Sequence, residues 1–217
     1  MQSKALFEGG DVVKAIRNLM IVGVIVMALV PLANAGMNKG DIVAGPTAQV
    51  GLPVGDFGDA ADVGFGFGAI GDYMVTNNVA IGADVVYNFF SASTDGFQSE
   101  GVDVKIDDFK VLQIGAHAKM YFNPMENTNP FVFAGLALYN SKGGGSASVE
   151  IPGVGTFDGS ASGSSTDFGV NAGGGAQFKA GEKMRLAAQA HVHMILSDPS
   201  STYIGAALSL LFGIGGN

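Results

Sequence analysis

Alternation of apolar and polar residues dominates the chain after residue 36 and predicts a β-sheet protein. In the segment Val79–Phe90, every second residue is predominantly apolar, and the residues between them are mostly small or polar. Period-two alternation is typical of a strand, because successive side chains point to opposite faces of a sheet. Thr76, Asn77 and Asn78 precede this segment, and Asn tolerates the backbone conformation of a tight hairpin turn. Gly71–Phe90 is therefore predicted to contain two strands joined by a short turn.

Eight alternating segments follow one another along the chain. They cover residues 42–52, 63–75, 79–90, 109–122, 130–139, 166–179, 184–196 and 202–212. The seventh is the clearest, with apolar side chains at its even positions and Arg185, Gln189, His191 and His193 at odd positions. Pro46 is expected to interrupt or bulge the first segment, because proline cannot donate a ladder hydrogen bond. The fifth segment is apolar on both faces, so its orientation stays open.

The connections between these segments alternate in length. The short ones are 76–78, 123–129 and 180–183. The long ones, 53–62, 91–108 and 140–165, are rich in Gly, Ser and Asp, and only the last connection on their side, 197–201, is short. Transmembrane β-barrels have short periplasmic turns and longer extracellular loops. The pattern predicts an all-β fold, an eight-stranded antiparallel transmembrane β-barrel with up-and-down connections; the alternative is a secreted β-sandwich.

Two of the long connections contain strand-like patterns of their own. Residues 146–151 and 156–160 flank Pro152-Gly153-Val154-Gly155, which indicates that strands five and six continue past the membrane as a hairpin. A flexible loop of low complexity is the alternative for this stretch. Val102–Ile106 is expected to extend strand four in the same direction.

The composition agrees with a sheet that is embedded in a membrane. Of the 217 residues, 34 are Gly, 47% are hydrophobic and only 14% are charged, which is about half of the usual charged fraction. The formal net charge of −8 and the lack of a basic patch argue against nucleic acid as a partner. Cysteine is absent, which excludes disulfides and thiolate metal sites.

Residues 1–35 have the features of a signal peptide, which leaves residues 36–217 as the barrel domain. Lys14 and Arg17 precede an apolar run from Leu19 to Leu32, and Ala33-Asn34-Ala35 is an A-x-A cleavage site. The apolar run is shorter than the roughly 20 residues that a membrane-spanning helix needs. An uncleaved N-terminal anchor helix is the alternative.

Alternation places the ionisable residues of the strands on the face opposite the aliphatic side chains. They are Asp72, Asp84, His117, Lys119, Asp167, Lys179, Arg185, His191 and His193. Such groups are costly in lipid, but in the lumen of a barrel they can pair and form hydrogen bonds. Because side chains fill the interior of an eight-stranded barrel, we expect a structural polar network rather than a path for protons or ions.

The sequence predicts no enzyme activity, cofactor or metal site. His191 and His193 point the same way, but only His117 remains as a further histidine, and zinc sites usually have three or four protein ligands. No outward His–Ser pair is available as base and nucleophile. The glycine runs at 64–68 and 173–175 are not followed by the helix that a phosphate-binding loop requires.

Three stretches of the chain carry a family resemblance. They are Tyr73–Gly82, Asn129–Gly135 and the C-terminal pattern Tyr203-x-Gly205-x-x-Leu208-x-Leu210-x-Phe212. The first two resemble a hairpin and the fifth-strand opening of the outer-membrane β-barrel domain family, the small eight-stranded barrels similar to OmpA, OmpX and OmpW. The third resembles the C-terminal signal that the barrel-assembly machinery reads, although Gly213–Asn217 follow the final aromatic residue.

The resemblance implies a location and a set of partners. We expect a monomer in the outer membrane of a Gram-negative bacterium, in contact with outer-membrane lipid and inserted by the barrel-assembly machinery. Its role is expected to be structural or surface-interacting, with an extracellular ligand bound by loops 91–108 and 140–165. The alternative is a narrow channel for small or apolar solutes, as in OmpW-like relatives.

Overall fold

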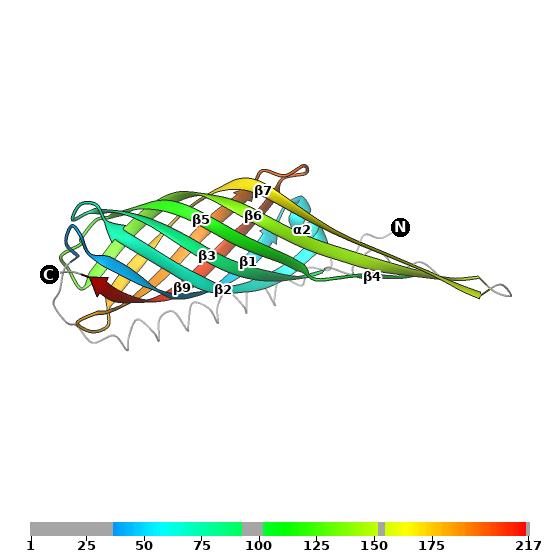
Figure 1. The fold of residues 1–217 in the computed structure, drawn as a ribbon, viewed down its shortest axis with the longest axis horizontal. Helices are drawn as coiled ribbons and strands as arrows, with labels where there is room; N and C mark the ends of the chain where they lie inside the picture. Colours follow the sequence, from blue (N-terminus) through cyan, green and yellow to red (C-terminus); the bar gives the residue numbers. More distant parts are fainter. Residues whose placement is uncertain (1–36, 93–101, 152–154, 216–217) are drawn as a thin grey trace, which may run out of the picture.

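Strands make up most of the described residues of the computed structural model, which are 37–92, 102–151 and 155–215. Eight of them form the barrel: β1 (Ile42–Val54), β2 (Ala61–Met74), β3 (Val79–Ala92), β5 (Phe109–Tyr121), β6 (Thr128–Ile151), β7 (Gly155–Lys179), β8 (Met184–Ile195) and β9 (Ser201–Gly215). A short strand, β4 (Val102–Ile106), and a short helix, α2 (Asp56–Ala60), complete the fold (Figure 1). The predicted signal peptide, residues 1–35, lies outside the described residues.

All neighbouring strands of the barrel are antiparallel, and β1 pairs with β9 to close it. The predicted barrel is therefore confirmed. Pro46 does not break β1, because it keeps its place opposite Ala69 of β2. On the β9 side, Ala44 pairs with Phe212 and Thr47 pairs with Ser209, while Pro46 has no partner. The register shift between these two strands lies nearby, between Ile42 and Val43. The proline therefore interrupts only the pairing of β1 with β9, where the barrel closes.

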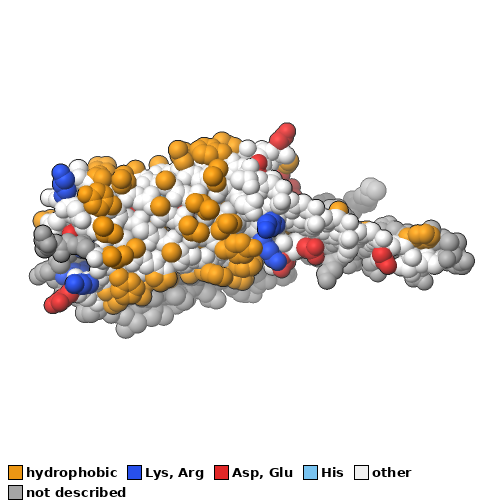
Figure 2. Space-filling model, in the orientation of Figure 1, with side chains coloured by type: hydrophobic (Ala, Val, Ile, Leu, Met, Phe, Trp, Pro, Cys, Tyr) orange, Lys and Arg blue, Asp and Glu red, His pale blue; other side chains and the backbone are white. Residues whose placement is uncertain are grey.

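The outer wall of the barrel is apolar, as the alternation predicts. Among its exposed large side chains are Phe65, Phe67, Ile81, Val85, Ile114, Leu136, Val192 and Ile204. Figure 2 shows hydrophobic side chains spread over the wall, with Lys, Arg, Asp and Glu side chains gathered toward its two ends. The structure also settles the orientation of β6, where Val132 and Leu138 face outward while Phe131 and Tyr139 are buried in the lumen.

An apolar plug closes the lumen at the end with the short turns. Met37, which precedes β1, is fully buried there. It packs in one cluster with Met74, Tyr121 and Phe131. Its backbone N–H donates to the carbonyl of Pro124 at 2.9 Å, so the segment before the first strand is held beneath the lumen.

A second apolar group closes the opposite end. Phe57 of α2 lies edge-on to Phe90 of β3 and to Phe109 of β5, with ring centroids 5.2 Å and 6.0 Å apart. These rings join a buried cluster that includes Tyr139 and Tyr203. The lumen is therefore covered from both sides by apolar side chains.

Strands β6 and β7 continue far beyond the barrel as a hairpin. Their register runs from Thr128↔Phe178 to Ile151↔Gly155 without a shift, and β4 pairs with residues 145–149 of β6. The predicted hairpin and the predicted extension of strand four are both confirmed. We call β4, residues 143–151 and residues 155–165 the projecting sheet (Figure 1). Among the described residues, no helix is long and apolar enough to cross a membrane.

A charge in the middle of the apolar wall tests the fold. Ile114 lies near the centre of β5 and is 52% exposed. We expect Ile114→Arg to lower the free energy of unfolding in a bilayer by about 2–4 kcal/mol, because the charge would face hydrocarbon. Equilibrium unfolding in liposomes, followed by circular dichroism, measures the change. Ser162→Arg on the projecting sheet is the control and should change it by less than about 0.5 kcal/mol. Equal effects of the two variants would contradict a membrane-embedded wall.

Candidate functional site

The predicted polar residues of β2, β3 and β5 meet in the middle of the lumen. Asp72 lies opposite Gly82, and Gly82 lies opposite His117, so the three occupy one row across three strands. The absence of a side chain at Gly82 leaves room for the other two. A Cβ atom at this position would lie 2.4 Å from His117 Nε2 and 2.5 Å from Asp72 Oδ1. Glycine here permits a contact across the lumen that alanine would block.

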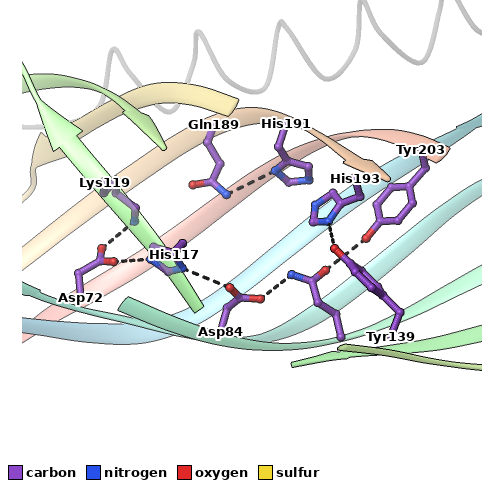
Figure 3. A network of polar contacts seen from close by, with 10 residues as sticks. Asp72, Asp84, His117, Lys119, Tyr139, Gln189, His191, His193 and Tyr203 are labelled. Carbon is purple, nitrogen blue, oxygen red and sulfur yellow. Dashed lines mark hydrogen bonds and ion pairs between the residues drawn. The ribbon is translucent and has the colours of Figure 1, made fainter. Parts of the chain in front are cut away.

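Two carboxylates, one lysine and one histidine form the centre of this lumen network (Figure 3). Lys119 Nζ donates to Asp72 Oδ2 at 2.7 Å. His117 lies between the carboxylates, with Nε2 2.7 Å from Asp72 Oδ1 and Nδ1 3.3 Å from Asp84 Oδ1. All four side chains are buried. A buried charge is stable only when it is paired and hydrogen-bonded, and each carboxylate here has such partners.

Gln113 links the charged centre to a group of aromatic rings. Its amide nitrogen donates to Asp84 Oδ2, and its carbonyl oxygen accepts from the hydroxyl of Tyr203 at 3.2 Å. The ring of Tyr203 stacks on His193, with centroids 4.5 Å apart and planes 6° apart. His193 Nδ1 in turn lies 2.7 Å from the hydroxyl of Tyr139. Ion pairs, hydrogen bonds and one ring stack therefore connect Lys119 to Tyr139 through the lumen.

His191 lies beside this group but is bonded differently. Its Nδ1 is 3.4 Å from the side-chain nitrogen of Gln189. Its ring occupies the space above Gly205, where a Cβ atom would lie 2.1 Å from Nε2. As at Gly82 of β3, a glycine on the neighbouring strand leaves room for a histidine ring. His191 is thus held by packing more than by hydrogen bonds.

The remaining predicted residues lie toward the two ends of the lumen. Lys179 of β7 and Arg185 of β8 are buried and lie opposite one another near the short turns. Asp167 is only half-buried and lies apart from the network, where it accepts a hydrogen bond from Ser165 Oγ at 2.7 Å. Asp167 lies two residues beyond the last pairing of β7 with β8, where the wall ends and water can reach it.

The lumen leaves little free space. Residues of the network surround a cavity of about 30 Å³, which is large enough for one or two water molecules but far too small for a solute path. Within the described part of the chain, no three His, Cys, Asp or Glu side chains are arranged to hold a metal ion. The arrangement can order water and fix the positions of the side chains.

Several lumen residues were not among those predicted for the network. Gln49 and Asn88 share a hydrogen bond of 2.6 Å, and Gln113 supplies the central link described above. Their place on the inward face was visible in the alternation, but selecting ionisable residues passed over neutral amides. Met37 carries no periodic signal, since it precedes the first strand. Its only sequence signal is that it is a lone large apolar residue in a polar stretch.

Comparison with known proteins identifies the fold. The profile of the family described as "Outer membrane protein beta-barrel domain" matches residues 22–212. Neisserial surface protein A is similar in structure, at 20% identity and a TM-score of 0.48 over 78% of this chain and 94% of that one. The outer membrane protein OprG from Pseudomonas aeruginosa gives 11% identity and 0.48 over 83% and 99%.

The N-terminal β-barrel domain of Pseudomonas aeruginosa OprF is also similar, at 15% identity and a TM-score of 0.42, over 82% of this chain and all of that domain. A search of curated proteins finds no significant match.

Breaking the buried ion pair tests whether the lumen network is structural. Lys119→Met leaves the Asp72 carboxylate without its lysine, and we expect this change to cost about 3–5 kcal/mol of unfolding free energy. Asp72→Asn combined with Lys119→Met should cost less than the sum of the two single changes, because no unpaired charge remains. Denaturant titration in liposomes measures all three. Lys183→Met, which removes an exposed lysine at a turn, is the control. Additive effects would show that the pair is not coupled.

Proposed function

Because the chain belongs to the outer membrane protein beta-barrel domain family and is located in the outer membrane of a Gram-negative bacterium, we propose that its barrel is a closed anchor for a protein-binding surface on the projecting sheet. The observation that carries this proposal is the free edge of β7. Strand β8 pairs with β7 only from Gly169 onward. The preceding residues, 155–168, have no neighbouring strand on that side among the described residues.

The direction of the backbone groups along this edge follows from the register. The carbonyl of Phe168 accepts from Leu196, and the N–H of Ala180 donates to Met184, so even-numbered residues of β7 point toward the β8 side. The pairing with β6 has no shift that would change this parity. Six residues therefore offer N–H and C=O groups to an incoming strand: Thr156, Asp158, Ser160, Ser162, Ser164 and Thr166.

The side chains leave this edge accessible. Proteins usually protect an exposed edge strand with proline, lysine or a bulge. Residues 159–166 of β7 contain only Gly, Ala, Ser and Thr, and one carboxylate, Asp158, stands at their outer end. A long, unprotected edge favours recognition by strand addition, in which main-chain hydrogen bonds supply the affinity. The partner would present an extended segment with small side chains.

The interior supports the role of an anchor over that of a channel. Apolar plugs around Met37 and Phe57 cover the two ends of the lumen, and the network fills the space between them. The projecting sheet is accessible without any rearrangement of the lumen side chains. We therefore propose a monomeric barrel without catalytic activity.

Strand β9 is our candidate for the assembly signal. Leu208, Leu210 and Phe212 alternate along it with buried residues, while Tyr203 and Gly205 are buried in the lumen. We propose that the barrel-assembly machinery reads this strand before it pairs with β1. The same strand then supplies one side of the closing seam.

Electrical recording separates the anchor from a channel. Purified protein in planar phosphatidylcholine bilayers should give no stepwise currents above leak, because the lumen is filled. A parallel measurement with dye-loaded liposomes should show no release. Reproducible current steps or solute release would contradict the closed anchor and support a narrow channel instead.

Proline scanning tests the β7 edge. In Ser160→Pro with Ser164→Pro, two edge N–H donors disappear while the pairing with β6 is retained, because these residues point away from β6. A photo-reactive residue at position 162 should form adducts with a surface protein on intact cells, and the proline variant should reduce them at least tenfold. Ser160→Ala with Ser164→Ala is the matched control and should retain them. Unchanged adducts in the proline variant would exclude strand addition, provided that gel mobility confirms a folded barrel.

A further inference from the structure

A pair of lysines stands on the outer wall at the foot of the projecting sheet. Lys110 of β5 and Lys142 of β6 lie directly opposite one another in the ladder, and both are exposed. They border a surface hollow of about 590 Å³, whose other lining residues are Asp107, Asp108, Gly143, Gly144, Ser162, Gly163 and Ser164. This hollow is separate from the lumen, and it borders the free edge of β7 at Ser162 and Ser164.

An aromatic cluster fixes the level of this hollow relative to the membrane. Phe89 stacks on Phe65 at 5.3 Å and meets Tyr87 edge-on at 4.8 Å, both on the outer face. Phe89 also lies opposite Lys110 on the next strand. Aromatic girdles of transmembrane barrels lie at the membrane–water interface. The lysine pair therefore lies at the level of the lipid headgroups on the side of the projecting sheet.

The two ammonium groups are placed unfavourably for the protein alone. Like charges directly opposite one another destabilise a pair of strands. Neither lysine forms an ion pair with any carboxylate in the described part of the chain. An anion bound between them would remove this repulsion.

The rest of the hollow suits a phosphate group. Gly144 lies opposite Ser162, and Lys142 lies opposite Ser164, so the register places two hydroxyl donors next to the lysine pair. Phosphate accepts several hydrogen bonds and is a common ligand of lysine. Hydroxyls and ammonium groups together would meet most of its oxygens.

The carboxylates of the hollow indicate whether a soluble polyanion or a lipid headgroup is the better ligand. Asp107 lies beside Gly144, and Asp108 accepts a 3.4 Å hydrogen bond from the N–H of Ala92. The hollow is therefore neutral overall, and the chain carries a formal net charge of −8. A soluble polyanion would gain little from such a field. A lipid is already confined to this level by its acyl chains, so local donors are sufficient to hold its headgroup.

We propose that Lys110 and Lys142 bind the phosphate of an outer-leaflet lipid headgroup. The inference depends on the placement of the barrel in the membrane and not on strand addition at β7, so either can fail alone. In its bound state, the lipid lies with its phosphate between the lysines and its acyl chains along the wall next to Phe89.

Native mass spectrometry of the detergent-solubilised barrel with bisphosphorylated lipid A, in the presence of EDTA, tests the proposal. Lys110→Gln with Lys142→Gln should weaken lipid A binding roughly 30-fold, from the usual contribution of each lysine at a membrane surface. The matched control is Lys39→Gln with Lys183→Gln, which removes the same charge from exposed lysines at the opposite end and should bind like the wild type. Equal weakening of both variants would show non-specific attraction and overturn the proposal.

Three further arms identify what the lysine pair recognises. Lys110→Arg with Lys142→Arg should restore binding to within about threefold, since the charge is retained. Lipid A without its phosphates should bind wild type and the glutamine variant equally. Inorganic phosphate at 10 mM, used alone as a probe, should bind far more weakly than lipid A. Binding of inorganic phosphate as strong as that of lipid A, or loss of affinity in the arginine variant as large as in the glutamine variant, would overturn the assignment to a lipid headgroup.

Discussion

Backbone hydrogen bonding in lipid is the constraint on which the rest of this molecule depends. An unpaired N–H or C=O group in hydrocarbon costs several kcal/mol, so a sheet can cross a membrane only if it has no edge. The pairing of β1 with β9 satisfies this condition for eight strands. Once the ring is closed, the register of each strand is fixed, and with it the face on which each side chain lies. The missing partner of Pro46 is tolerated because residues on both sides of it pair β1 with β9.

Closure with so few strands also determines what the interior can contain. The lumen is narrow, so two of the large polar side chains lie over a glycine on a neighbouring strand. Gly82 faces His117, and Gly205 faces His191. The polar groups thus fill the space that glycines leave, and they satisfy one another because water has almost no access. This explains how a chain with many buried ionisable groups can remain stable in a membrane.

Alternation predicted the strands and the inward face, because the side-chain period of a strand is independent of its partners. The alternating lengths of the connections predicted the closed barrel. Alternation did not predict the orientation of a strand whose successive residues are alike in polarity. Strand β6 is apolar on both faces, and its inward Phe131 and Tyr139 were recognisable only once the neighbouring strands were in place. Asp167 occupies an odd position, as the inward residues of β7 do, but it lies beyond the end of the barrel wall. Alternation does not show how far along the barrel axis a residue lies. Hydrogen-bond partners such as Gln113 depend on distances across the lumen, which no local pattern encodes.

The end of the wall is where both proposed surfaces arise, and the same physics explains why. At the ladder row that joins Phe89, Lys110 and Lys142 to Ser164, the surroundings change from hydrocarbon to headgroups and then to water. Above this level an unpaired backbone edge is no longer forbidden, so β7 can leave β8 and stay open to another strand. At this level a lysine is favoured, since its stem covers apolar wall while its charge reaches the headgroups. A lipid phosphate held by the lysine pair would therefore lie at the base of the projecting sheet.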